Sequence, residues 1–325
     1  MSVLPATTAE PKSGEISRSQ PAGTAFDPVF RILCFSAATL LLTALSGIVI
    51  SLLIGGWPAL AAFKLNFFIS SDWDPGQDIY GGAGPIVGTL ITAVMSLVIA
   101  LPIAFGVAVF LVEFCPPLIR RPIGIAVELL AGVPSIVYGM WGLFVFAPLF
   151  RDVVELPLIM SAQPGSLQEK IFSGIPNGSG ILAASIILAI MILPYIAAAM
   201  RELFLTVPAK VRESAYGVGC TTLEVIWSVT LPYVRRSAIG AVMLGLGRAL
   251  GETMAVTFII GNSHTFPNGL FDGGSTIAST IANEFAEATS DMHTAALIAL
   301  GLVLFIITFA VLAIARALLG APKHG

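Results

Sequence analysis

Long apolar runs separated by short polar stretches fill most of the chain. A helix needs about 20 apolar residues to cross a bilayer, and six runs reach that length. Because lipid offers no hydrogen-bond partners, helices must satisfy the backbone there, and no barrel-type alternation occurs. We therefore expect an all-α integral membrane protein whose six-helix transmembrane domain covers residues 29–318. The runs cover residues 32–54, 85–112, 122–150, 180–200, 237–260 and 294–315.

Composition supports this class and offers little other chemistry. Hydrophobic residues make up 56% of the 325-residue chain and charged residues 11%, with a mean hydropathy of +0.93, a balance typical of membrane proteins. The cysteines are scattered and the histidines isolated, so we expect neither a disulfide framework nor a metal site. Residues 1–28, rich in Ser, Thr, Ala and Pro, predict a disordered tail, and residues 319–325 a second tail.

Basic residues are sorted between two sets of loops. The loops after the first, third and fifth runs hold only Lys64, Arg151 and Lys170 and are rich in acidic residues. Lys and Arg accumulate in the cytoplasmic loops of membrane proteins. We therefore expect a multi-pass protein of the cytoplasmic membrane with both termini in the cytoplasm. The basic residues on that side are Lys12, Arg18, Arg31, Arg120, Arg121, Arg201, Lys210, Arg212, Arg235, Arg236, Arg316 and Lys323.

The fourth loop, residues 201–236, is too polar to enter the bilayer. Pro208 suits the first turn of a helix, and Gly217 and Gly219 are expected to end that helix. The loop therefore begins with one short helix that stops at a glycine turn.

A second short helix is predicted directly after this turn. Thr221 and Glu224 have the spacing of a capping box, in which each side chain satisfies a backbone N–H of the first turn. This helix is expected to end near Leu231 and Pro232, just before the fifth apolar run. Two short helices joined by glycines would form a compact cytoplasmic projection.

Arg248 and Glu252 are the only charged residues between 237 and 260. On a continuous helix they lie one turn apart, share a face and can pair. Gly247 and Gly251 have the small-xxx-small spacing that lets another helix approach closely. A central Arg costs roughly 2.5–3.5 kcal/mol on insertion scales, so it should face protein or a water-filled path. The pair is therefore either a structural clamp between helices or an anion site on a translocation path.

Two other stretches carry local predictions. Residues 275–288 have the spacing of a short amphipathic helix on the outer face, with a partly buried re-entrant segment as the alternative. In the third apolar run, Glu128 is expected to pair with Arg120 or Arg121 at the interface. Residues 132–135, which include a glycine and a proline, are expected to kink the same helix.

The spacing within the fourth loop resembles the EAA loop of binding-protein-dependent ABC permeases. That pattern is Glu-Ala-Ala, three residues, Gly, nine residues and Ile-x-Leu-Pro; here Ser214 replaces the first Ala and Val229 replaces Ile. In that family the loop docks into a groove on a cytoplasmic ATPase. The resemblance therefore implies a coupling role for Glu213, Ser214, Ala215, Gly219, Leu231 and Pro232.

Three further segments narrow the resemblance. They are GLGRALGETMAVTFIIGN (245–262), GVPSIVYGMWGLFVFAPLF (132–150) and ANEFAEA (282–288), and they look like the PstC type of phosphate ABC permease subunit. The resemblance runs through nearly the whole membrane domain. It implies that Arg248 and Glu252 lie on the substrate path, where a guanidinium offers a fork of donors suited to phosphate oxygens.

The implied function is ATP-driven import of inorganic phosphate, with this chain as a transmembrane permease subunit and not an enzyme. The implied partners are a cytoplasmic ABC ATPase of the PstB type, a second permease subunit of the PstA type and an extracytoplasmic phosphate-binding protein of the PstS type, with no nucleic acid. No Gly-x-x-x-x-Gly-Lys-Ser/Thr occurs, so we expect ATP and Mg²⁺ on the ATPase and no cofactor on this chain. Import of sulfate or molybdate, a non-conducting assembly or signalling subunit and, more weakly, a secondary transporter remain as alternatives.

Overall fold

The computed structural model describes residues 27–319, and the chain divides into two units, Met1–Ile50 and Ser51–Gly325. The described part of the first unit belongs to helix α1 (Asp27–Phe63), and nearly all its side chains up to Ile50 are exposed. The predicted tails lie outside the described residues, apart from the few positions that begin α1 and end the last helix.

Four helices dominate the described part of the second unit: α3 (Ala83–Val109), α9 (Ile181–Leu205), α12 (Leu231–Leu250) and α15 (Asp291–Leu319). A small antiparallel hairpin pairs β1 with β2. The remaining elements are α2 (Asn66–Ile69), β1 (Trp73–Asp74), β2 (Ile79–Tyr80), α4 (Pro117–Ala131), α5 (Ser135–Trp141), α6 (Ala147–Phe150), α7 (Leu156–Ser161), α8 (Leu167–Ile171), α10 (Ala209–Gly217), α11 (Thr222–Val225), α13 (Met254–Thr257), α14 (Ile277–Glu284) and the π-helical segments η1 (Phe110–Phe114), η2 (Gly142–Phe146), η3 (Arg151–Glu155) and η4 (Ile226–Thr230).

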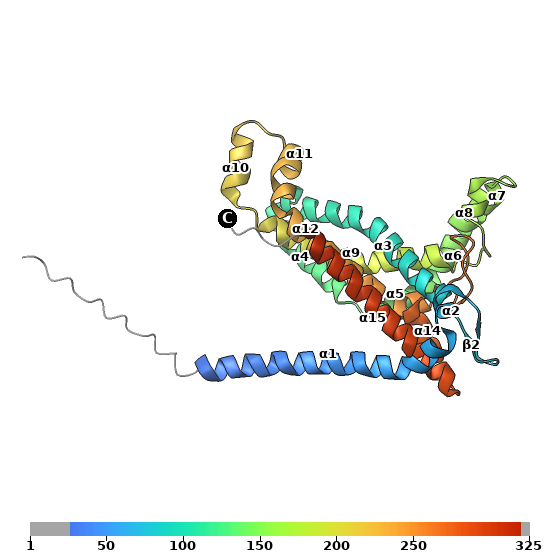
Figure 1. Cartoon of the computed structure of the whole chain (residues 1–325). Helices are drawn as coiled ribbons and strands as arrows, with labels where there is room; N and C mark the ends of the chain where they lie inside the picture. Colours follow the sequence, from blue (N-terminus) through green and yellow to red (C-terminus); the bar gives the residue numbers. More distant parts are fainter. Residues whose placement is uncertain (1–26, 320–325) are drawn as a thin grey trace, which may run out of the picture. The chain divides into compact units, whose positions relative to one another are not determined.

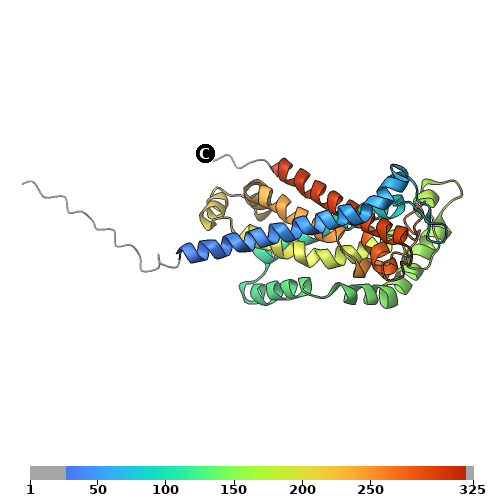
Figure 2. The ribbon, with the colours of Figure 1, turned by 60° about the horizontal axis from the view of Figure 1, so that its bottom comes forward.

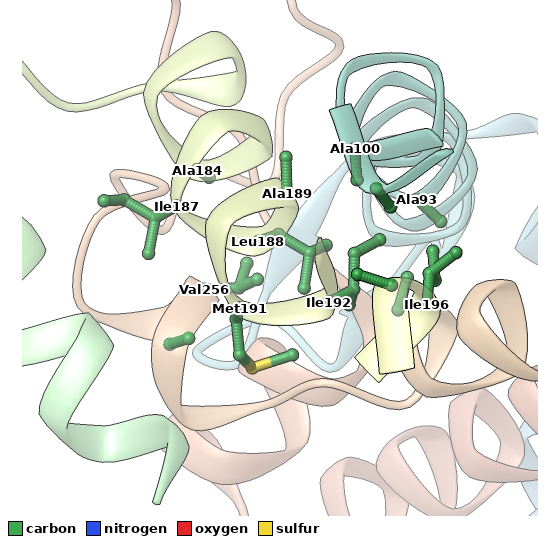
Figure 3. Close-up of a cluster of buried hydrophobic side chains, with 14 of the residues drawn as sticks. Ala93, Ala100, Ala184, Ile187, Leu188, Ala189, Met191, Ile192, Ile196 and Val256 are labelled. Atoms are coloured by element: carbon green, nitrogen blue, oxygen red, sulfur yellow. The ribbon is translucent and has the colours of Figure 1, made fainter. Parts of the chain in front are cut away.

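The core of the second unit surrounds α9. Figure 3 shows aliphatic side chains of α9, such as Leu188, Ile192 and Ile196, lying beside Ala93 and Ala100 of α3. Alanines recur about every four residues on the buried face of α3, and small residues let two helices approach closely where lipid supplies no hydrophobic driving force. The closely packed pair of α3 and α9 therefore forms the centre of the core, and residues of other elements such as α12 and α13 pack against it.

The membrane class is confirmed, but the count of six continuous helices is not. Among the described residues, four helices are long and apolar enough to cross a membrane, and they correspond to the first, second, fourth and sixth predicted runs. The third run is broken: α4 and the helical stretch from Ser135 to Ser161 meet at an angle of 85°. Pro134 explains the break, because proline lacks the N–H and pushes the preceding residue out of the helical region. The predicted kink is therefore a full interruption.

The segment from 275 to 288 was expected to be a short helix, and α14 confirms it. Its first turn, from Ile277 to Thr280, is buried, as the re-entrant alternative requires. The Ile277 N–H donates to the Thr89 hydroxyl of α3 across 2.9 Å. At Gly88, the residue before Thr89, the backbone of Ser275 comes so close that any side chain would collide with it.

Within the second unit, the polar elements gather at two ends. Figures 1 and 2 show α10 and α11 beside the end of α15, whereas α2, β2, α8 and α14 lie at the other end of the helices. The loops that the charge pattern assigned to opposite sides of the membrane are thus separated along the helix axes.

Candidate functional site

The fourth loop forms the projection that its sequence predicts. Helix α10 begins directly after Pro208 and ends at Gly217, and four residues separate it from α11, which begins at Thr222. Figure 1 shows the two helices standing side by side. No residue of α10 is buried, and Glu213 and Tyr216 are exposed. The loop therefore offers a polar helical surface for contact with another molecule.

Gly219 ends α10 through a specific backbone motif. The Gly219 N–H donates to the Tyr216 carbonyl at 2.9 Å, and the Cys220 N–H donates to the Ala215 carbonyl at 3.1 Å. These two bonds are those of a Schellman motif, which needs a residue with positive φ after the helix. Gly219 supplies it with a φ of +93°. The glycine of the EAA-like pattern is therefore a helix-stop residue.

The capping box is confirmed, but the predicted end of the second helix is wrong. The Thr221 hydroxyl accepts from the Glu224 N–H, while the Glu224 carboxylate accepts from the Thr221 N–H at 2.7 Å. After α11 the chain continues through η4 directly into α12. Pro232 lies in the first turn of α12, and the wider π turn before it accommodates a ring that would clash in an uninterrupted α-helix.

The expected pairing of Arg248 with Glu252 is also wrong. Helix α12 ends at Leu250, so the two residues are not on one continuous helix, and no ion pair joins them among the described residues. The Glu252 carboxylate instead accepts from the Ala255 N–H at 3.3 Å, at the start of α13. Such local side-chain bonds compete with helix continuation. The fifth run is therefore interrupted between its two charges.

Arg248 has few partners for a guanidinium inside a helical core. Its Cζ atom lies 5.6 Å from the centre of the Tyr195 ring of α9, a cation–π contact. Its Nε is buried and has no hydrogen-bond partner in the part of the chain that the structure describes. An unpaired charge in a membrane is unfavourable unless a ligand or water compensates it. The side chain thus keeps one N–H donor that no described residue accepts.

The close helix approach predicted for α12 occurs at a different glycine. A Cβ atom added at Gly245 would lie 2.7 Å from the side chain of Ile196, whereas one at Gly247 or Gly251 would meet nothing nearer than 3.7 Å. The small-xxx-small spacing identified the correct helix but the wrong face, because α9 packs on the side that carries Gly245.

Two ion pairs connect helix ends near the projection. The expected partners of Glu128 were wrong: it pairs with Arg201 of α9 at 2.7 Å, while the Arg201 guanidinium lies over Gly124. The second pair joins Glu113 of η1 to Arg212 of α10 at 3.2 Å. Glu128 therefore links α4 to α9, and Glu113 links the end of the second span to the projection.

Comparison with known proteins identifies the chain's family. Residues 83–320 match the family described as "Binding-protein-dependent transport system inner membrane component". The chain belongs to this family. The permease is 52% identical over 296 residues to the "Phosphate transport system permease protein PstC" of Mesorhizobium japonicum, with 90% of each chain covered. It is 38% identical over 307 residues to "Phosphate transport system permease protein PstC 2" of Mycobacterium tuberculosis, with 91% of this chain and 93% of the relative covered.

Solved structures share the fold of this permease at low sequence identity. One belongs to a bacterial ABC transporter involved in import of the acidic polysaccharide alginate, with a TM-score of 0.52 and 16% identity over 90% of this chain and 99% of that one. Another is the MetNI methionine ABC transporter, with a TM-score of 0.51 and 18% identity over 73% of this chain and 97% of that one. The chain therefore has an ABC importer permease fold.

At the other end of the permease, a cluster forms around Glu284 that the sequence analysis missed. Its carboxylate accepts from His264 Nε2 at 2.7 Å, His293 Nε2 at 2.9 Å and Trp73 Nε1 at 2.7 Å. The rings of Tyr80 and His293 stack at 5.2 Å. Burial alone raises the pKa of Glu284, but the three hydrogen bonds outweigh it and hold the pKa below its usual range.

This cluster ties together four segments that are distant in sequence. The histidines looked isolated because His264 and His293 are separated by α14, and only the fold turns both rings toward one carboxylate. The segment ANEFAEA, which contains Glu284, was the available signal. Within the described residues no group of His, Cys, Asp or Glu is arranged to hold a metal ion. The hydrogen bonds to Glu284 join α14 to β1, to the loop that carries His264 and to α15.

Proposed function

We propose that this chain is the transmembrane permease subunit of an ATP-driven importer for inorganic phosphate. The observation that carries the proposal is Arg248, in the last turn of α12, where the fifth apolar run is interrupted. Its buried Nε has no acceptor among the described residues. Phosphate is a strong bidentate acceptor for such a donor fork. The name of a relative that is 52% identical over 90% of this chain supplies the identity of the anion.

Arg248 would act by charge compensation. A phosphate ion that enters an apolar path loses its hydration shell, and a guanidinium already held in that path replaces part of it. Tyr195 holds the guanidinium from its face and leaves the edge N–H groups available. Glu252 lies on the same path, where its negative charge would repel an anion that has moved past Arg248 and so limit how tightly the ion is held.

The EAA-like loop would couple this path to ATP hydrolysis on another protein. Helix α10 presents Glu213 and Ser214 on an exposed surface, and Gly219 fixes the angle at which the chain leaves that surface. We assign the docking of a cytoplasmic ABC ATPase of the PstB type to this surface. A second permease subunit of the PstA type completes the path, and a phosphate-binding protein of the PstS type delivers phosphate from outside.

The proposal includes an orientation. The end that carries α10 and α11 faces the cytoplasm, together with both termini, because the basic residues gather there. The end that carries α14 and the Glu284 cluster faces outward, toward the binding protein.

Replacement of Arg248 tests the anion site. Arg248→Gln keeps a polar group but removes the charge, and it strands no partner because Glu252 is bonded elsewhere. We expect the variant to insert and assemble but to transport no labelled phosphate in reconstituted vesicles. Arg236→Gln, at an exposed position near the start of the same helix, is the matched control and should transport normally. Normal uptake by Arg248→Gln would remove the residue from the substrate path.

A further inference from the structure

The geometry points to Arg212 as the residue that joins the coupling helix to the membrane helices; this inference rests on the proposed function of the loop. We propose that its guanidinium transmits displacement of α10 to the adjoining ends of α3 and α9. The role is one of positioning, since Arg212 touches neither the substrate path around Arg248 nor the exposed face of α10 that carries Glu213.

Helix α10 has no hydrophobic anchor. It buries none of its residues, and only Thr206, Val207 and Pro208 separate it from the end of α9. Most helices of soluble and membrane proteins are held by packing of an apolar face. Polar contacts must therefore fix the position of α10, and Arg212 makes several of them.

One guanidinium reaches two membrane helices at once. Arg212 Nη1 donates to Glu113 Oε1 at 3.2 Å, and Nη2 donates to the carbonyls of Phe204 and, at 3.4 Å, Val207. Phe204 belongs to the last turn of α9, where carbonyls lack partners within the helix and attract positive charge. The planar fork of arginine suits this double contact, which a lysine ammonium cannot reproduce.

The ion pair between Glu113 and Arg212 is largely shielded from solvent. The side chain of Glu113 is 9% exposed and that of Arg212 17%, whereas Glu128 in the neighbouring pair is 51% exposed. Partly buried pairs lose far more than surface pairs when one partner is removed. Glu113 lies in η1, a π-helical extension of α3, and π segments in α-helices often mark functional positions. A shift of α10 therefore pulls on the end of α3 through Glu113 and on the end of α9 through its carbonyls.

Hydrogen exchange of the purified chain tests the physical link. Glu113→Gln removes the charge at nearly constant shape, and Arg212→Lys keeps the charge but loses the fork. Loss of a partly buried pair should accelerate exchange in residues 209–217 by about tenfold in either variant. Glu128→Gln, which breaks only the α4–α9 pair, is the matched control and should leave exchange there unchanged. Unchanged exchange in both variants, or equal acceleration in the control, would overturn the inference.

Transport in vesicles that contain the ATPase and the second permease subunit then tests the role in coupling. We expect Glu113→Gln and Arg212→Lys to retain the ATPase on co-purification but to move severalfold less labelled phosphate per ATP hydrolysed. If exchange accelerates while the phosphate-to-ATP ratio stays at the wild-type value, the pair is only structural and the inference fails. Absence of phosphate uptake by the wild-type protein would instead contradict the proposed function. The hydrogen-exchange result would still show whether Arg212 and Glu113 hold α10 in place.

Discussion

Gly219 and Gly217 form a matched pair for testing how the fourth loop, residues 201–236, is built and whether it has the proposed coupling role. Both glycines lie at the end of α10, and a Cβ atom at either would meet nothing within 4 Å. Only Gly219 has a positive φ, at +93°. Steric crowding is therefore equal at the two positions, and any difference between their alanine variants reports the backbone conformation alone.

The cost at Gly219 follows from its conformation. An L-residue in the left-handed region costs about 1–2 kcal/mol, which corresponds to a factor of roughly 5–30 in the equilibrium between the closed Schellman turn and its opened form. At Gly217, which is helical, alanine gains up to about 1 kcal/mol because glycine is the weaker helix former. We expect Gly219→Asn to cost less than Gly219→Ala, since asparagine tolerates the left-handed region, and Gly219→Val to cost most.

Substrate-stimulated ATP hydrolysis of the assembled transporter is the assay. Stimulation should fall in the order Asn, Ala and Val at position 219, while Gly217→Ala stays at the wild-type level and all variants insert into the membrane. Exchange of the amide protons of Gly219 and Cys220, which close the turn, should rise in the same order. Equal losses in Gly217→Ala and Gly219→Ala would refute the conformational argument, and full stimulation in Gly219→Val would refute the coupling role.

Three further predictions concern packing, pH and orientation. Gly245→Val should destabilise the chain by about 1–3 kcal/mol through overpacking against α9, whereas Gly247→Val, where an added Cβ would meet only Leu312 at an ordinary contact distance of 3.7 Å, should change its thermal unfolding less; equal effects would contradict the packing. The pKa of Glu284 is lowered in the folded protein, so its ionised carboxylate stabilises the fold above the ordinary glutamate pKa, and this stabilisation is lost as pH falls through the lowered value. Thermal unfolding measured across acidic pH should therefore depend less on pH in Glu284→Gln than in the wild-type protein. An impermeant thiol reagent added outside should label Thr289→Cys and spare the native Cys220, in a background that lacks the other cysteines; the reverse pattern would invert the orientation.

The sequence predicted the membrane class and, in the fourth loop, the first helix, its glycine stop and the capping box of the second helix, but not where that second helix ends. The features predicted correctly depend on neighbouring residues: apolar runs of sufficient length, a capping box at Thr221 and Glu224, and a glycine at a helix end. Such signals act over a few residues and need no knowledge of the tertiary fold. Relatives at 52% identity carry the same function in their names, in agreement with the resemblance seen in the motifs.

Predictions that assumed an unbroken helix were wrong. Pairing of Arg248 with Glu252 requires i and i+4 on one helix, but α12 ends between them, and apolarity alone does not reveal such an interruption. Ion-pair partners that are distant in sequence could not be predicted from the sequence either. Glu128 pairs with Arg201 rather than with its neighbours in sequence, because α4 lies against α9 and the geometry of that packing is not encoded in the local pattern.

Uptake of labelled phosphate into vesicles that contain this chain, the second permease subunit and the ATPase, with the binding protein added on the outer side, tests the central claim most directly. We expect uptake that needs ATP on the cytoplasmic side, that excess unlabelled phosphate suppresses, and that sulfate and molybdate leave unchanged. Uptake without ATP, or suppression by sulfate or molybdate as strong as by phosphate, would contradict the assignment of this chain to an ATP-driven phosphate importer.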